Sequence, residues 1–205
     1  KQIQVLQGIR RSGKSSLFKL MINHLSQNID PQEILYINLD DPFFTKYSND
    51  PKSFYEILQT AKKLTQKEIK YLFLDEVQAI KGWEKYVKSV YDSNEFEKIF
   101  ITGSNSSLLN GEFATLLTGR YISTKVYPLS FLEILNINGI KSFLELNKQL
   151  PKVLKLVDDM MNYGSFVEVY QLQDDLKREV LSSYYDTILL KDCIANNQIR
   201  DIKGF

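Results

Sequence analysis

The sequence predicts an α/β fold, in which a parallel sheet is covered by helices on both faces and is followed by a helical subdomain. Short apolar runs alternate with helical patterns up to Pro128, which is typical of parallel α/β sheets. After Pro128 the strand patterns largely stop, while helical patterns continue. We therefore expect a sheet-containing core over residues 1–128 and a helical, lid-like subdomain over residues 129–205.

The expected strands are short apolar runs bounded by breaking residues. They lie at residues 2–7, 34–39, 71–74, 98–102 and 121–127. The expected helices carry apolar residues at three- and four-residue spacing. They lie at residues 14–25, 51–63, 82–92, around 108–117, 131–135, 151–161 and 172–190. One of the later helices shows an amphipathic stripe, formed by Leu150, Val153, Leu154, Val157 and Met161.

A glycine-rich stretch connects the first expected strand to the first expected helix. Gly8, Gly13, Lys14 and Ser15 give the spacing G-x-x-x-x-G-K-S, the pattern of a P-loop. Glycines let backbone N–H groups turn toward phosphate oxygens, and the helix N-terminus adds its positive dipole end. We expect Lys14 to reach the β- and γ-phosphates of a nucleotide and Ser15 to ligate Mg2+. The expected phosphate-binding residues are Gly8, Ile9, Arg10, Arg11, Ser12, Gly13, Lys14, Ser15 and Ser16.

Two carboxylates follow the third expected strand. Asp75 and Glu76 come directly after four apolar residues, and ligands gather at the carboxyl ends of parallel strands. Asp75 is therefore a candidate to hold Mg2+, and Glu76 is a candidate to orient and deprotonate an attacking water. The alternative is a helix N-cap, because acidic residues after a strand often start the next helix.

Polar residues also follow the fourth expected strand. Ser104 and Asn105, with Thr102 behind them, could contact the γ-phosphate or the water if this strand lies between the first and the third. They fit a cap for the following helix equally well.

Three arginines are further candidates. Arg120 precedes the fifth strand and could serve as an arginine finger on a neighbouring subunit's nucleotide, or could be a surface residue paired with a carboxylate. Arg10 and Arg11 lie at variable P-loop positions, where they either touch phosphate or are solvated.

Composition narrows the class of protein. The 205 residues are 43% hydrophobic with net charge +1, which predicts a folded chain and gives no bulk charge for a polyanion partner. The single cysteine, Cys193, excludes an intramolecular disulfide and fits the cytoplasm. No apolar run approaches the roughly 18 residues of a membrane span, and no secretory signal is present. Because the sequence starts on a strand and stops after a helical pattern, we expect a fragment of a longer protein.

Five motifs, taken in order, resemble the AAA-type ATPases of bacteria and archaea that carry an uncharacterised C-terminal domain. The matching segments are residues 8–16, 74–78 with 82–84, 101–105, 117–121 and 127–131. Residues 185–192 also resemble the entry of that family into its C-terminal region.

The resemblance implies an AAA+ core with a five-stranded parallel sheet of order 5-1-4-3-2. It implies ATP and Mg2+ as ligands, Lys14 and Ser15 on the phosphates and the metal, Asp75 on the metal and Glu76 as the base. It implies a sensor role near Ser104 or Asn105, and it places Arg120 where many AAA+ proteins carry their finger. It also implies ATP over GTP, since the sequence lacks a base-reading N-K-x-D motif.

These observations favour an enzyme in which MgATP hydrolysis drives a conformational change in an attached domain or partner. The first alternative is a nucleotide-gated binding module with little hydrolysis, linked to DNA or to a protein. The second alternative is a small-molecule phosphotransferase, which Glu76 and the helical subdomain make the weaker choice. A homo-oligomer, and a DNA or protein partner bound through a region beyond residue 205, are both compatible with the sequence.

Overall fold

The computed structural model describes residues 2–47, 51–65, 67–103 and 111–188. They form two compact units. The first unit contains residues 1–9 and 14–126, and the second contains residues 10–13 and 127–205. All five expected strands lie in the first unit.

Five strands of the described chain form one parallel sheet in the order β2-β3-β4-β1-β5. This confirms the predicted order 5-1-4-3-2. The apolar composition of the strands suits a sheet that is covered on both faces. The strands are β1 (Ile3–Gln7), β2 (Ile34–Asn38), β3 (Tyr71–Asp75), β4 (Lys98–Gly103) and β5 (Tyr121–Lys125). The last strand therefore ends at Lys125, two residues before the predicted end.

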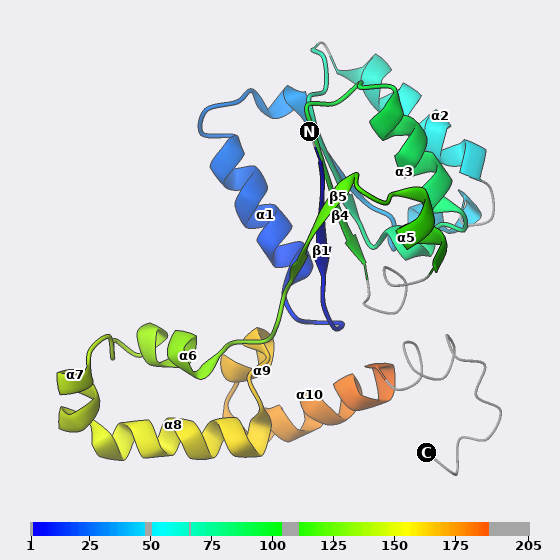
Figure 1. Ribbon diagram of the computed structural model, residues 1–205. Helices are drawn as coiled ribbons and strands as arrows, with labels where there is room; N and C mark the ends of the chain where they lie inside the picture. Colours follow the sequence, from blue (N-terminus) through cyan, green and yellow to red (C-terminus); the bar gives the residue numbers. More distant parts are fainter. Residues whose placement is uncertain (1, 48–50, 66, 104–110, 189–205) are drawn as a thin grey trace. The chain divides into compact units, whose positions relative to one another are not determined.

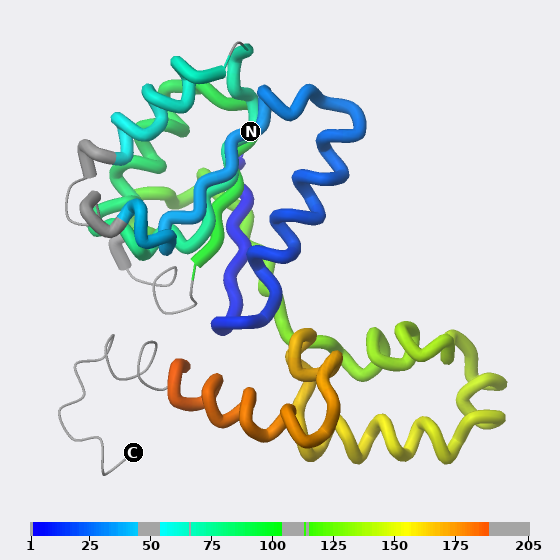
Figure 2. Tube along the Cα trace, turned by 180° about the vertical axis from the view of Figure 1, so that it is seen from behind, coloured from blue at the N-terminus to red at the C-terminus, as the bar shows by residue number. Residues whose placement is uncertain are grey.

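The helices of the first unit cover the two faces of the sheet unequally. Figures 1 and 2 show α1 alone on one face and α2, α3 and α5 on the other. The α-helices are α1 (Lys14–Leu25), α2 (Pro51–Leu64), α3 (Trp83–Asp92) and α5 (Gly111–Leu116). Short 3-10 helices are η1 (Pro31–Glu33), η2 (Pro42–Tyr47) and η3 (Val77–Ala79). Part of the helix expected around residues 108–117 lies outside the described residues.

Alternate strand residues build a separate core on each face. Under α1, Phe18 packs edge-on against Phe73 at 5.1 Å between ring centroids, and Phe73 stacks on Phe100 at 4.3 Å. The opposite face buries a larger cluster that includes Val5, Leu74 and residues of α2 and α3. The sheet is thereby held between two packed layers, with its carboxyl ends left for polar residues.

The second unit is helical around a small core of its own. Its helices are α6 (Phe131–Ile137), α7 (Phe143–Lys148), α8 (Leu150–Tyr163), α9 (Val167–Tyr170) and α10 (Asp174–Thr187). Capping boxes at Ser130 with Glu133, and at Ser142 with Glu145, begin α6 and α7. The core comprises Ile134, Leu135, Ile140, Val153 and Leu156.

The predicted stripe on α8 differs from the buried residues. Of its five members only Val153 is buried, and it is joined by Leu156. The other four are exposed, namely Leu150, Leu154, Val157 and Met161. They are exposed because the small core of this unit contacts only one side of α8. Within the described residues, no helix has the length and apolar character needed to span a membrane.

Candidate functional site

The loop between β1 and α1 folds around the Lys14 side chain. The Nζ of this buried lysine donates to the carbonyl oxygens of Gly8 and Ile9, at 3.0 and 3.1 Å. The backbone of Gly13 has φ of 98°, a conformation that favours glycine. Arg11 also has positive φ, at 65°, so the chain turns sharply twice before α1 begins. The G-x-x-x-x-G-K-S spacing thus corresponds to a tight loop that ends on a helix N-terminus.

A buried hydroxyl in this loop fits a phosphate ligand. The Ser12 Oγ is buried, and no hydrogen-bond partner for it lies among the residues that the structure describes. Such a group costs free energy until a partner satisfies it, and a phosphate oxygen is a suitable acceptor. Ser15 is partly buried in the first turn of α1. Mg2+ in nucleotide sites is usually bound by one or two protein oxygens together with phosphate oxygens. The Ser15 hydroxyl and one carboxylate, for which Asp75 is the candidate, are ligands of this kind.

The sheet brings the other candidate residues to the same edge as the loop. Strand β4 lies between β1 and β3, and Leu6 on β1 is in register with Thr102 on β4. On the other side of β4, Leu74 is in register with Ile101, which places Asp75 beside Thr102. Because the strands are parallel, their carboxyl ends all lie at one edge, where ligands bind in such sheets.

Asp75 is held by two hydroxyl groups from the neighbouring strands. Its Oδ1 accepts a hydrogen bond from Thr102 Oγ1, and its Oδ2 accepts one of 2.8 Å from Tyr36 Oη on β2. Burial raises the pKa of the Tyr36 phenol, and the hydrogen bond to Asp75 raises it further. The phenol therefore stays a proton donor to Asp75 throughout the neutral range. Tyr36 was missed in the sequence analysis, although its position two residues before the carboxyl end of a strand is a signal.

Glu76 has an unusual backbone and a restrained side chain. Its φ and ψ are 54° and 52°, in the left-handed region, and its N–H donates to Thr102 Oγ1 at 3.0 Å. Its carboxylate accepts a hydrogen bond from the Gln78 side-chain amide. Glu76 stands at the N-cap position of η3, but its side chain makes no capping hydrogen bond. The cap expected as an alternative role for these acidic residues is therefore not formed by Glu76.

The remaining candidates are spread over both units. Ser104 and Asn105 lie outside the described residues. Arg120 pairs with Asp92 at 3.4 Å between Nε and Oδ1, which is the carboxylate pairing expected as an alternative to a finger. In the second unit, Arg11 pairs with Glu168 at 3.3 Å and its guanidinium lies 4.1 Å from the centroid of the Tyr184 ring.

The other loop residues have different exposures. Arg10 is partly buried, whereas Ile9 and Ser16 are exposed.

Among the described residues, no group of three or more His, Cys, Asp or Glu side chains could hold a metal ion.

A parallel sheet of this order, with a G-x-x-x-x-G-K-S loop after β1, defines a P-loop NTPase fold. A family model described as an AAA domain matches residues 1–135. The chain therefore belongs to the AAA-type P-loop ATPases, a family whose members generally bind nucleotide with Mg2+.

Known relatives match nearly all of this chain and are longer than it. An uncharacterised protein of Haemophilus influenzae is 38% identical over 200 residues, which are 97% of this chain and 48% of the relative. An uncharacterised protein of Methanocaldococcus jannaschii is 35% identical over 207 residues, 98% of this chain and 44% of the relative. The chain thus spans about half the length of the curated relatives it matches.

Among solved structures, the Orc1 protein of Aeropyrum pernix in complex with DNA matches with a TM-score of 0.48 and 13% identity. That match covers 68% of this chain and 43% of the Orc1 chain.

Proposed function

We propose that this chain binds MgATP and hydrolyses it, and that hydrolysis drives a conformational change in an attached domain or partner. The observation that supports this most strongly is the pairing of a buried, doubly hydrogen-bonded Asp75 with Glu76 at the carboxyl end of β3. These carboxylates are separated from the P-loop strand by β4 alone. This arrangement suits a metal-holding aspartate beside a general base.

Each residue has a separate task in the proposed reaction. Lys14 exchanges its contacts with the Gly8 and Ile9 carbonyls for oxygens of the β- and γ-phosphates. Ser15 and Asp75 hold Mg2+, which neutralises charge on the phosphates when bound. Glu76 accepts a proton from water as the water oxygen bonds to the γ-phosphorus and the bond to the ADP oxygen breaks. The N–H groups of the loop and the Ser12 hydroxyl stabilise the phosphate oxygens.

A second candidate function has an observation of its own in its favour. The Gln78 side-chain amide donates a hydrogen bond to the Glu76 carboxylate. If this hydrogen bond persisted with ATP bound, Glu76 could not accept a proton from water and hydrolysis would be very slow. The chain would then act as a nucleotide-gated binding module for a partner. The two functions share the binding site and differ in turnover.

Calorimetric titration of MgATP, together with measurement of phosphate release, tests the proposal. We expect Lys14→Ala to weaken ATP binding by at least about tenfold, because the ion pairs with the phosphates are lost. The matched control is Lys19→Ala, which removes the same charge from an exposed position of α1. Equal affinities for wild type and Lys14→Ala would contradict the proposed site. Tight binding without phosphate release would favour the gated module.

A further inference from the structure

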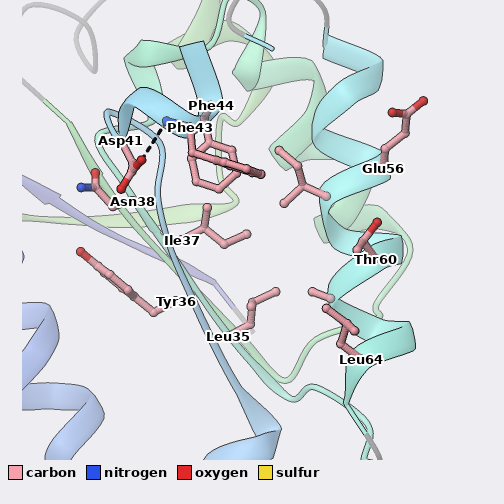
Figure 3. A pocket seen from close by; sticks show the side chains of 12 residues that line it. Leu35, Tyr36, Ile37, Asn38, Asp41, Phe43, Phe44, Glu56, Thr60 and Leu64 are labelled. Carbon is pink, nitrogen blue, oxygen red and sulfur yellow. Dashed lines mark hydrogen bonds between the residues drawn. The ribbon is translucent and has the colours of Figure 1, made fainter. Parts of the chain in front are cut away.

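A groove lies between strand β2 and helix α2, on the far side of β3 from the P-loop strand. Its volume is about 610 Å³, and apolar side chains form most of its walls. In Figure 3, Leu35 and Ile37 point into it from β2, and Leu64 points into it from α2. Phe43 and Phe44 of η2 close one end. We call this feature the β2–α2 groove; its α2 wall is completed by Ile57, Thr60 and Ala61.

Strand β2 is an outer strand of the sheet, and one of its edges pairs with no other strand of the described residues. The Glu33 carbonyl accepts from Lys70 N at 2.8 Å, and Leu39 N donates to the Asp75 carbonyl at 3.0 Å. Because backbone polar groups of successive strand residues point to opposite sides, the odd-numbered residues of β2 pair with β3. The even-numbered residues therefore direct their backbone N–H and C=O groups away from the sheet.

Most of these outward groups have no protein partner among the residues that the structure describes. Ile34 N donates to the Pro31 carbonyl, and the Asn38 carbonyl accepts from Asp41 N at 3.3 Å. Within the described ranges, no partner is found for the Ile34 carbonyl, for either backbone group of Tyr36, or for Asn38 N. Backbone groups of this kind are the template that an added strand uses.

The sequence of β2 does not protect this edge. Exposed edge strands are commonly blunted by lysine, by proline or by other charged residues. Strand β2 reads Ile-Leu-Tyr-Ile-Asn, with no charge and no proline, whereas the other outer strand, β5, reads Tyr-Ile-Ser-Thr-Lys. Beside β2, Leu64 is 80% exposed and Phe43 is 65% exposed, which leaves apolar surface next to the free backbone groups.

The geometry and charge of the groove select one kind of ligand. A strand paired with β2 would place alternate side chains on the face of Leu35 and Ile37, inside the groove and against α2. Apolar side chains suit that position. Of the described residues that line the groove, Asp41 and Glu56 are acidic and none is basic. Basic residues beside the apolar ones would therefore complement the charge.

We propose that the β2–α2 groove binds an extended protein segment that pairs with β2, carries apolar residues at alternate positions and is flanked by lysine or arginine. The segment adds a strand to the sheet through Ile34, Tyr36 and Asn38, and its apolar side chains fill the groove. The proposed nucleotide site uses none of these groove-facing side chains, so the two sites can be tested separately.

The probe is an array of heptapeptides with Val, Ile, Leu or Phe at alternate positions, Ser between them and Lys at both ends. The tightest binders are then measured in solution by fluorescence anisotropy. We expect a Kd below ~100 μM. N-methylation of the peptide at the residues that face β2 should weaken binding at least tenfold, because it removes backbone donors and keeps every side chain.

Two variants of the protein complete the test. Leu64→Lys replaces an apolar side chain in the groove wall by a charged one and should weaken peptide binding at least tenfold. Because the Leu64 side chain is highly exposed, the fold does not depend on it. Gln59→Lys makes the same charge change on α2 outside the groove and should alter binding less than twofold. Three results would each overturn the proposal: no binding across the array up to ~1 mM, binding that N-methylation leaves unchanged, or a self-association of the chain that Leu64→Lys abolishes and that blocks the peptide.

Discussion

Replacing Thr102 by valine tests the hydrogen-bond network that holds the two carboxylates. Thr102 is 0% exposed and Asp75 is 1% exposed, so water cannot replace a lost partner. The Thr102 hydroxyl donates to Asp75 and accepts from the Glu76 N–H. Valine has nearly the same shape, so the substitution removes both hydrogen bonds without leaving a cavity.

The expected loss of stability follows from these two bonds. Losing a buried hydrogen bond to a charged group costs about 1.5–3 kcal/mol, and the partly buried Glu76 N–H adds a smaller cost because water can reach it. We therefore expect a loss of about 2 kcal/mol or more in the free energy of unfolding, measured by urea denaturation. For a chain of this size, the melting temperature should fall by about 4 °C or more.

The matched control makes the same substitution at an exposed strand position. Thr124 lies on β5 with its side chain exposed, so Thr124→Val should change stability by less than about 0.5 kcal/mol. If Thr102→Val cost no more than Thr124→Val, the network would contribute nothing to the folded state. The proposed positioning of Asp75 and Glu76 would then lose its structural basis.

Further predictions concern single residues of the site and its surroundings. Gln78→Ala should raise ATP turnover at least about twofold, because it releases the Glu76 carboxylate; a fall in turnover measured by phosphate release would show that Gln78 assists the reaction. Arg120→Ala should leave turnover unchanged and cost only about 0–1 kcal/mol in urea denaturation, as for an exposed ion pair with Asp92. A large loss of turnover at high protein concentration would instead make Arg120 a finger in trans. In the folded chain the pKa of Tyr36 is raised above its value of about 10 in the unfolded chain. Above about pH 10 the unfolded chain releases a proton that the folded chain keeps, so the free energy of unfolding falls as pH rises. Below about pH 10 this contribution to stability is fully present. The free energy of unfolding, measured by urea denaturation from neutral to strongly alkaline pH, should therefore fall less steeply with pH for Tyr36→Phe than for wild type. The same pH dependence for both proteins would contradict the raised pKa of the phenol.

The strands and long helices could be predicted because their signals are local. Runs such as residues 71–74 are apolar enough to be buried on both faces, and the P-loop lies between a strand and a helix, where its chemistry requires it. The strand order was implied by the family resemblance and is confirmed by the sheet. Short helices such as α7 and α9 have too few residues to generate a periodic pattern.

The side-chain network could not be predicted from residue spacing. Tyr36 reaches Asp75 only because β2 and β3 are paired with Asn38 opposite Asp75, and that register is a property of the folded sheet. The exposure of Leu154 and Met161 on α8 has a similar cause. A periodic pattern shows which residues share a helix face, whereas burial depends on which other element covers that face.

Steady-state phosphate release by wild type and by Glu76→Gln, with ATP affinity measured on the same samples, tests whether Glu76 is the general base of ATP hydrolysis. The matched control is Glu179→Gln, the same substitution at an exposed position of α10. We predict that Glu76→Gln lowers turnover by about 100-fold or more while ATP binding is retained, because the general base is lost and the phosphate contacts remain. Equal turnover for wild type, Glu76→Gln and Glu179→Gln would exclude Glu76 as the general base.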